Sequence, residues 1–193
     1  MKLPDKLKKA LEFLVKTIPK DVYWALSNGS AAFLYGGKRE PTDIDIGTDK
    51  DGINKIVEVL KLDSPKWVDK GIFYVYVAKA KIEGYEIEFW SEAVIRVNGK
   101  EYNRVVDEEV ITRTKKVRVD NLEIPVSPPE DVVASKAITQ RSIESGKGDI
   151  EDIQAIMDNQ NIDWKYLEER ANRMNGYDRI IQLLRDLGYS RTD

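Results

Sequence analysis

The spacing of apolar side chains changes along the chain between a helical period and a strand period. In residues 4–18, leucines and an isoleucine recur every three or four positions with lysines between them, and Pro19 ends the run, which predicts an amphipathic helix. The stretch DVYWALS then predicts a short strand, and GSAAFLYGG predicts a short helix closed by glycines. In TDIDIGT apolar and acidic side chains alternate, which is typical of a strand.

Helical spacing returns in residues 51–62, with Asp51 as the expected N-cap. Two strand patterns, 70–82 and 85–91, flank Glu83-Gly84 and predict a hairpin. Residues 94–126 continue as short polar strands, with Asn98-Gly99 as a second hairpin turn.

Beyond Ser127-Pro128-Pro129 the apolar positions follow a helical period as far as residue 187. The pattern therefore predicts an α+β protein with an α/β-like N-terminal half, in which helices flank a mixed β-sheet. A C-terminal helical domain follows this core. We place the boundary after residue 126, which gives a core over 1–126 and a helical domain over 127–193.

Composition is that of a folded globular protein, with 41% hydrophobic and 34% charged residues among 193 and a net charge of −3. This balance excludes a disordered chain and offers no sign of a nucleic-acid partner. No apolar run approaches the roughly 18 residues of a membrane span, and the N-terminus lacks the features of a signal peptide, so we expect a cytoplasmic protein. The Lys/Glu-rich, cysteine-free composition is typical of thermophiles.

The chain contains no cysteine and no histidine. Disulfides, thiolate zinc sites and thiol catalysis are thereby excluded, and so is the usual acid–base side chain at neutral pH. Catalysis must depend on carboxylates, lysines, hydroxyls or backbone groups, and a bound metal is expected to be a hard, oxygen-binding ion such as Mg²⁺.

Asp43 and Asp45 lie on one face of the strand predicted in TDIDIGT, because side chains alternate along a strand. Two neighbouring carboxylates repel each other unless a cation lies between them. An alternative is the end of a strand that enters a solvated loop. The pair Gly29-Ser30, twelve residues upstream, favours a functional site. A glycine that opens a helix lets backbone N–H groups approach a phosphate, and the serine adds a hydroxyl donor.

The segment NGSAAFLYGGKREPTDIDI resembles the signature of the DNA polymerase-β-like nucleotidyltransferase superfamily, although Asn28 occupies a position that is usually hydrophobic. The resemblance implies a nucleotidyltransferase core in which Asp43 and Asp45 bind metal with a third carboxylate on a neighbouring strand. Glu88 is the preferred third carboxylate because apolar residues flank it, and Glu86 is the alternative. These glutamates are equally compatible with exposed strand carboxylates that face lysines.

The segment from Pro128 to Met157 is similar to AbiEii-type nucleotidyltransferases and their minimal relatives. Its matching positions are Lys136, Arg141, Lys147, Asp149 and Asp152, with Gly148 inserted after the third. The resemblance implies that the basic residues neutralise a triphosphate while the two aspartates orient them. Helix-start electrostatics would equally explain the aspartates, and a snorkelling side chain would explain Lys136.

Together the resemblances imply a metal-dependent transfer of a nucleoside monophosphate from a nucleoside triphosphate to an acceptor hydroxyl, with release of pyrophosphate. Two Mg²⁺ ions are expected on Asp43, Asp45 and Glu88. The nucleotide is expected to contact Gly29, Ser30, Lys136, Arg141, Asp149 and Asp152. The acceptor stays open between a tRNA end, a protein hydroxyl and a small molecule such as an aminoglycoside. The alternative is an inactive nucleotide-binding protein, or a toxin–antitoxin partner, of the same fold.

One further basic stretch, ITRTKKVRVD, is predicted to be a strand that carries Arg113, Lys115, Lys116 and Arg118. It would suit either an RNA backbone or an edge strand that lysines protect from aggregation, and we favour the second interpretation.

Overall fold

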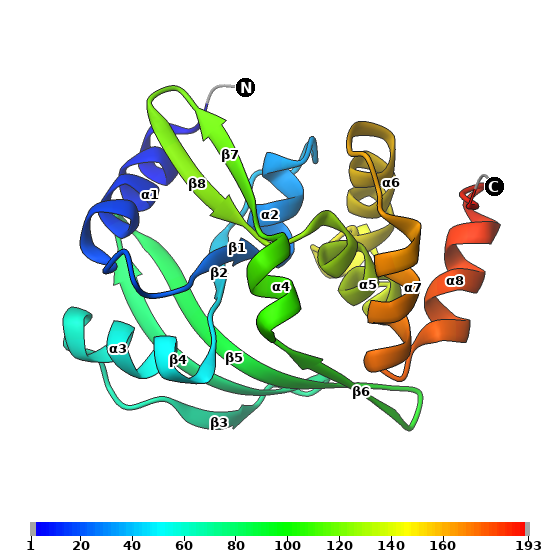
Figure 1. The fold of residues 1–193 in the computed structure, drawn as a ribbon, viewed down its shortest axis with the longest axis horizontal. Coiled ribbons are helices and arrows are strands. Elements are labelled where there is room, and N and C mark those ends of the chain that lie inside the picture. Colours follow the sequence, from blue (N-terminus) through cyan, green and yellow to red (C-terminus); the bar gives the residue numbers. More distant parts are fainter. Residues whose placement is uncertain (1–2, 192–193) are drawn as a thin grey trace.

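The computed structural model describes residues 3–191, and its helices and strands are arranged as shown in Figure 1. The strands are β1 (Ala25–Ser27), β2 (Asp43–Gly47), β3 (Lys66–Asp69), β4 (Phe73–Ile82), β5 (Tyr85–Val97), β6 (Lys100–Val105), β7 (Lys115–Val119) and β8 (Leu122–Val126). The helices are α1 (Asp5–Thr17), α2 (Asn28–Leu34), α3 (Lys50–Leu60), α4 (Glu108–Arg113), α5 (Pro129–Thr139), the 3₁₀ turn η1 (Ile143–Ser145), α6 (Asp149–Asn159), α7 (Trp164–Arg173) and α8 (Tyr177–Asp186).

Within the described residues the eight strands form one mixed sheet in the order β3-β4-β5-β2-β1-β8-β7, with β6 paired to β5. Strand β2 runs parallel to the first half of β5, and β6 runs antiparallel to its second half. The predicted α+β class is therefore confirmed, as are the first helix, the β4–β5 hairpin and the helical C-terminal third. No helix in residues 3–191 has both the length and the apolar character of a membrane span.

Two local predictions were wrong, and one strand was not predicted. Asp49, not Asp51, caps α3, since its side chain accepts the N–H of Gly52, while Asp51 lies within the first turn. Helix α4 was expected to be part of a strand region, but its six residues are too few to show a helical period. Strand β3 was not foreseen, because three of its four residues are exposed and its sequence lacks a buried face.

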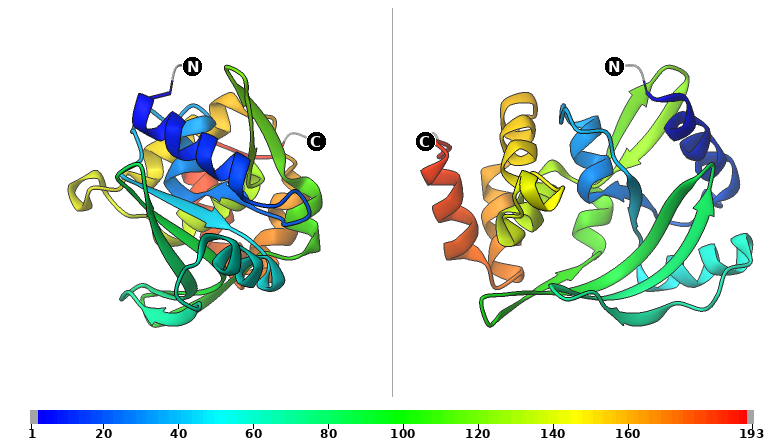
Figure 2. Two further views of the ribbon diagram at one scale, coloured as in Figure 1. Left: turned by 90° about the vertical axis from the view of Figure 1, so that its left-hand side faces the viewer. Right: turned by 180° about the vertical axis from the view of Figure 1, so that it is seen from behind.

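Helices α1 and α3 lie on one side of the molecule, and α5 to α8 lie together on the opposite side, with α2 between the sheet and α5 (Figures 1 and 2). The sheet face that carries Ile44, Ile46, Ile87 and Phe89 is fully buried. One continuous core includes these side chains together with residues of α1 and of the C-terminal helices. The division at residue 127 stays a prediction, and its outer limits at residues 1 and 193 lie outside the described chain.

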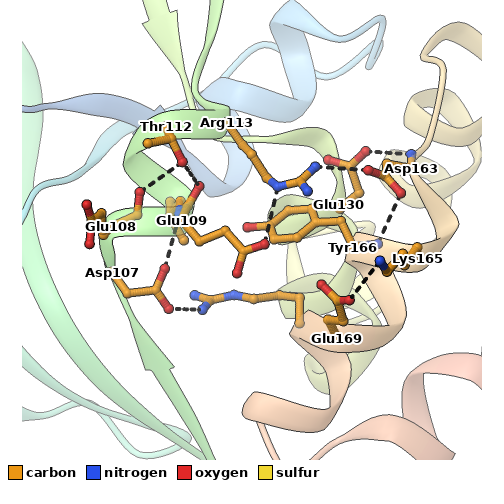
Figure 3. A network of polar contacts seen from close by, with 12 residues as sticks. Asp107, Glu108, Glu109, Thr112, Arg113, Glu130, Asp163, Lys165, Tyr166 and Glu169 are labelled. Atoms are coloured by element: carbon orange, nitrogen blue, oxygen red, sulfur yellow. Dashed lines mark hydrogen bonds and ion pairs between the residues drawn. The ribbon is translucent and has the colours of Figure 1, made fainter.

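Polar contacts attach α4 to the start of α7, which is in turn attached to α5 (Figure 3). Arg113 donates to Asp163 at 2.9 Å and lies 4.1 Å above the ring of Tyr166. The carboxylate of Glu130 on α5 accepts the backbone N–H of Asp163 at 2.8 Å. These contacts fix the segment that follows β6 against the helical half of the chain.

The basic stretch 111–120 divides between two elements. Arg113 belongs to α4, which corrects the prediction that it lies on a strand. The other three basic residues lie on β7, which is an edge of the sheet, and Lys116 pairs with Glu123 at 2.8 Å. This position agrees with the edge-strand interpretation.

Candidate active site

The strand register brings the three predicted carboxylates together on one face of the sheet. Asp45 lies beside Glu88 on the parallel strand β5 and beside Ser27 on the antiparallel strand β1. Asp43, Asp45 and Glu88 line one cavity of about 200 Å³. Glu86 pairs in register with Asp43, but it is exposed and is not part of the cavity lining, so the geometry favours Glu88 as the third carboxylate.

Basic side chains dominate the rest of the cavity lining. Within residues 3–191 the wall carries six of them: Arg39, Lys70, Arg104, Lys136, Arg141 and Lys147. Its apolar part is formed by Phe73, Val75, Trp90 and Ala93. The cavity thus combines carboxylates from the sheet with cations from loops, from β6 and from the helical half.

The aspartate pair has little electrostatic compensation. The ion pairs of the cavity's arginines and lysines lead to Glu88, Asp149 and Asp152, and in the described chain none of them leads to Asp43 or Asp45. Burial raises the pKa of Asp45 to about 6, and the neighbouring negative charges of Asp43 and Glu88 add to this effect. A hydrogen bond from Asn28 opposes it only in part.

Glu88 is in a different environment. Lys70, from the loop between β3 and β4, pairs with one of its oxygens, and Lys79 on β4 pairs with the other at 2.9 Å. Burial raises the pKa of Glu88, but the hydrogen bonds from Lys70 and Lys79 outweigh burial and hold it below its usual value. Glu88 is therefore ionised at neutral pH.

The donor set fits a hard cation, because two carboxylates without a cationic partner lie side by side in a site that has only oxygen ligands. In this conformation no group of three acidic side chains within residues 3–191 converges closely enough to hold a metal ion. The reason is visible at Glu88, since two lysines already hold its oxygens.

Lys136 lies at the centre of a buried ion-pair network. Lys136 is only 2% exposed, and its ammonium group donates to Asp149 at 3.1 Å and to Asp152 at 2.6 Å. Arg141 contacts Asp149 through Nε and Nη2, at 2.9 and 3.1 Å. Burial opposes ionisation of Asp149, but Arg141 and Lys136 hold its pKa well below its ordinary value. Lys136 and Arg141 face the cavity while the aspartates lie behind them, so snorkelling does not account for Lys136.

The pair Gly29-Ser30 opens α2 beside the cavity, but the two residues differ in position. Gly29 lines the cavity, and a Cβ added there would meet only Arg39 Nη2, at 3.5 Å. Ser30 is buried outside the lining, and its hydroxyl donates to the backbone carbonyl of Asp43 at 3.1 Å. In this conformation Ser30 supports the strand that carries the aspartates.

Solved structures with a similar fold include a candidate nucleotidyltransferase, a nucleotidyltransferase-like protein and an antibiotic-modifying enzyme. A candidate nucleotidyltransferase from Thermotoga maritima aligns over 76% of this chain and 91% of its own length, with a TM-score of 0.60 and 19% identity. A nucleotidyltransferase-like protein from Paracoccidioides brasiliensis aligns over 97% and 92%, with a TM-score of 0.54 and 14% identity. The antibiotic-modifying ANT(2″)-Ia, in complex with adenylyl-2″-tobramycin, aligns over 89% and 96%, with a TM-score of 0.53 and 10% identity.

The chain has the nucleotidyltransferase fold. No protein-family model and no curated protein matches its sequence. At these low identities the similarity establishes the fold, and the AbiEii-type resemblance stays a prediction.

Among the described residues of the cavity lining, the sequence interpretation missed seven: Arg39, Lys70, Phe73, Val75, Trp90, Ala93 and Arg104. Arg104 left a detectable signal, because it shares a face of β6 with the buried Tyr102 and so occupies an inward position of an alternating strand. The positions of Arg39 and Lys70 depend on loop conformation, which the apolar pattern does not encode.

Proposed function

We propose that this protein is a member of the DNA polymerase-β-like superfamily that transfers a nucleoside monophosphate from a nucleoside triphosphate to an acceptor hydroxyl. The observation that carries the proposal is the aspartate pair without cationic partners, which faces Lys136 and Arg141 across the cavity of a nucleotidyltransferase fold. Carboxylates for a metal and cations for phosphates are the two requirements of phosphoryl transfer.

Asp43 and Asp45, together with Glu88, would hold Mg²⁺. The bound metal would neutralise charge on the transferred phosphoryl group. Asn28 donates to Asp45 and so fixes the orientation of that carboxylate. Ser30 fixes the backbone of Asp43. Alternation along β2 places the two aspartates on the same face, where both line the cavity, and these contacts support that arrangement.

In the transfer itself, the acceptor oxygen forms a bond to the α-phosphorus while the bond from this phosphorus to the oxygen that bridges to the β-phosphorus breaks. Pyrophosphate leaves, and the proton of the acceptor hydroxyl passes to a carboxylate, for which Glu88 is the candidate. Glu88 is ionised, and each carboxylate oxygen has a second lone pair beyond its contact with Lys70 or Lys79.

The triphosphate would be bound by Lys136 and Arg141, which Asp149 and Asp152 hold in place. Gly29 leaves the adjacent wall free of a side chain, so the backbone at the start of α2 is accessible from the cavity. Positioning of this kind supplies much of the catalysis in phosphoryl transfer.

The charge of the cavity bears on the acceptor. Within the described residues six basic and three acidic side chains line it. A polycation would meet repulsion there, which disfavours an aminoglycoside such as tobramycin, whose adenylyl derivative is bound to ANT(2″)-Ia. A tRNA end, a protein hydroxyl or an uncharged small molecule fits the lining better.

The test is incubation of the purified protein with Mg²⁺, labelled ATP, GTP, CTP or UTP, and total RNA or cell lysate, with pyrophosphate release and labelled products as readouts. We expect transfer by the wild type and none by the Asp43→Asn, Asp45→Asn double variant, with Glu86→Gln as an active control. Transfer that persists in the double variant rejects the mechanism. Tight metal-independent nucleotide binding without pyrophosphate release would identify an inactive binding protein. No nucleotide binding at all would favour a toxin–antitoxin partner protein.

A further inference from the structure

Arg104 is a buried cation on the cavity wall, and its side-chain hydrogen bond within the described chain goes to a neutral amide. It lies on β6 opposite Ala93 and is 4% exposed. Its Nη1 donates to the side-chain oxygen of Asn28 at 2.7 Å, and its guanidinium lies 4.1 Å from the centre of the Trp90 ring. In the described chain Arg104 forms no ion pair, although Asp131 and Asp45 act on it through space.

Arg170 provides an internal comparison. It is 3% exposed, and it pairs with Asp131 at 2.6 Å and with Asp107 at 3.0 Å. Its burial is thus compensated within the protein, as expected of a structural arginine. Arg104 is buried to the same degree without such compensation, and burial lowers its pKa to about 10, which leaves it charged at neutral pH.

A buried charge without a counterion is unfavourable unless a ligand supplies the opposite charge. Among the cavity's cations, Lys136 and Arg141 are already paired with carboxylates, while Arg104 is not. The guanidinium of Arg104 packs over the ring of Trp90. Within the described chain this guanidinium forms one hydrogen bond, to Asn28. The remaining N–H groups form a planar fork that matches the oxygens of a phosphate.

We propose that Arg104 binds the polyphosphate chain of the nucleotide. Asn28, its hydrogen-bond partner, directly precedes Gly29, and all three residues line the cavity. Arg104 therefore lies beside the backbone where the proposed function places the triphosphate, on which this inference rests. Through Asn28 the arginine also connects to Asp45, so the phosphate-binding group and a carboxylate of the aspartate pair share one amide side chain.

The test is calorimetric titration of the full-length protein with Mg²⁺-ATP, with inorganic tripolyphosphate and with adenosine. Arg104→Met, Arg104→Lys and the surface control Arg118→Met are compared with the wild type. We expect Arg104→Met to weaken ATP and tripolyphosphate binding about 10- to 100-fold, as loss of a charge-assisted hydrogen bond does. Arg104→Lys, which keeps the charge but not the fork, should lose less. Adenosine binding and the control should not change.

A structural role predicts different results. Since methionine removes an uncompensated buried charge, our proposal predicts that ligand-free Arg104→Met melts at the wild-type temperature or above. A lower melting temperature with weaker adenosine binding would overturn it. The proposal would also be overturned if Arg104→Met bound both ATP and tripolyphosphate with wild-type affinity. Failure of the wild type to bind any nucleotide would instead reject the proposed function, and this inference with it.

Discussion

Replacement of Asp45 by asparagine should make the metal-free protein more stable. The side chain keeps its size and its ability to accept the hydrogen bond of Asn28, but it loses a charge that burial, Asp43 and Glu88 all disfavour. The pKa of Asp45 rises from 3.8 to about 6 on folding. At about 1.36 kcal/mol per pKa unit, this difference corresponds to roughly 3 kcal/mol. Because the cavity is open to water, we expect a gain of about 1–3 kcal/mol in the free energy of unfolding.

The effect should depend on pH in a defined direction. A carboxylate whose folded pKa lies above its unfolded pKa destabilises the protein progressively as the pH rises between the two values, and fully above the higher one. For Asp45 this window runs from 3.8 to about 6. The advantage of Asp45→Asn over the wild type should therefore be complete at pH 7.5, reduced to about a third near pH 4.5, and absent at still lower pH.

The assay is urea denaturation of both proteins in EDTA at several pH values, with the exposed Glu86→Gln as the matched control. Added Mg²⁺ should then stabilise the wild type but not Asp45→Asn, because a ligand that binds only the folded state shifts unfolding by mass action. The control should match the wild type throughout. If Asp45→Asn were less stable than the wild type at pH 7.5 in EDTA, the electrostatic reasoning about the aspartate pair would be refuted.

Three other measurements test the remaining site. Asp149→Asn should lower the free energy of unfolding by about 3–5 kcal/mol in urea titrations, because Arg141 loses its carboxylate and the buried Lys136 keeps only Asp152. A loss below 1 kcal/mol would contradict the network. Glu88→Gln should lower the rate of pyrophosphate release at saturating nucleotide and acceptor at least 10²-fold if this carboxylate takes the acceptor proton. A loss of this size in Glu86→Gln, with activity retained in Glu88→Gln, would show that the wrong glutamate was chosen. Tobramycin added with ATP and Mg²⁺ should stimulate no pyrophosphate release, and adenylylated tobramycin detected by mass spectrometry would disprove the argument from cavity charge.

The aspartate site could be predicted because it depends on a period of two. Alternation along β2 places Asp43 and Asp45 on one face and two buried isoleucines on the other, whatever the neighbouring strands are. The position of Glu88 beside Asp45, within the cavity lining, favours it over the exposed Glu86. The register between β2 and β5 was not evident in the sequence, which is why both glutamates stayed open.

The environment of Lys136 was harder to predict. A lysine among apolar residues suggests a side chain that reaches the surface, but every residue of α5 is buried, so this helix offers no surface to reach. Its partners Asp149 and Asp152 lie 13 and 16 residues later, beyond a turn whose geometry the pattern does not reveal. Arg104 was missed because its inward position was signalled by a single apolar residue, Tyr102, on the same face of a strand of six residues.

The sign of a stability change can separate the two kinds of buried charge in this cavity. Lys136, Arg141, Asp149 and Asp152 compensate one another inside the protein, so removal of a member takes away an ion pair of the buried network and should destabilise the fold whether or not a nucleotide binds. Asp45 and Arg104 lack such partners, so their neutral replacements should preserve or raise stability while ligand binding falls. A buried charge that lowers stability is expected where the counterion is a ligand, because selection then maintains the residue for binding rather than for folding. A stability scan of neutral substitutions around the cavity, done without metal or nucleotide, would therefore distinguish the ligand-binding groups from the residues that position them, before any acceptor is known.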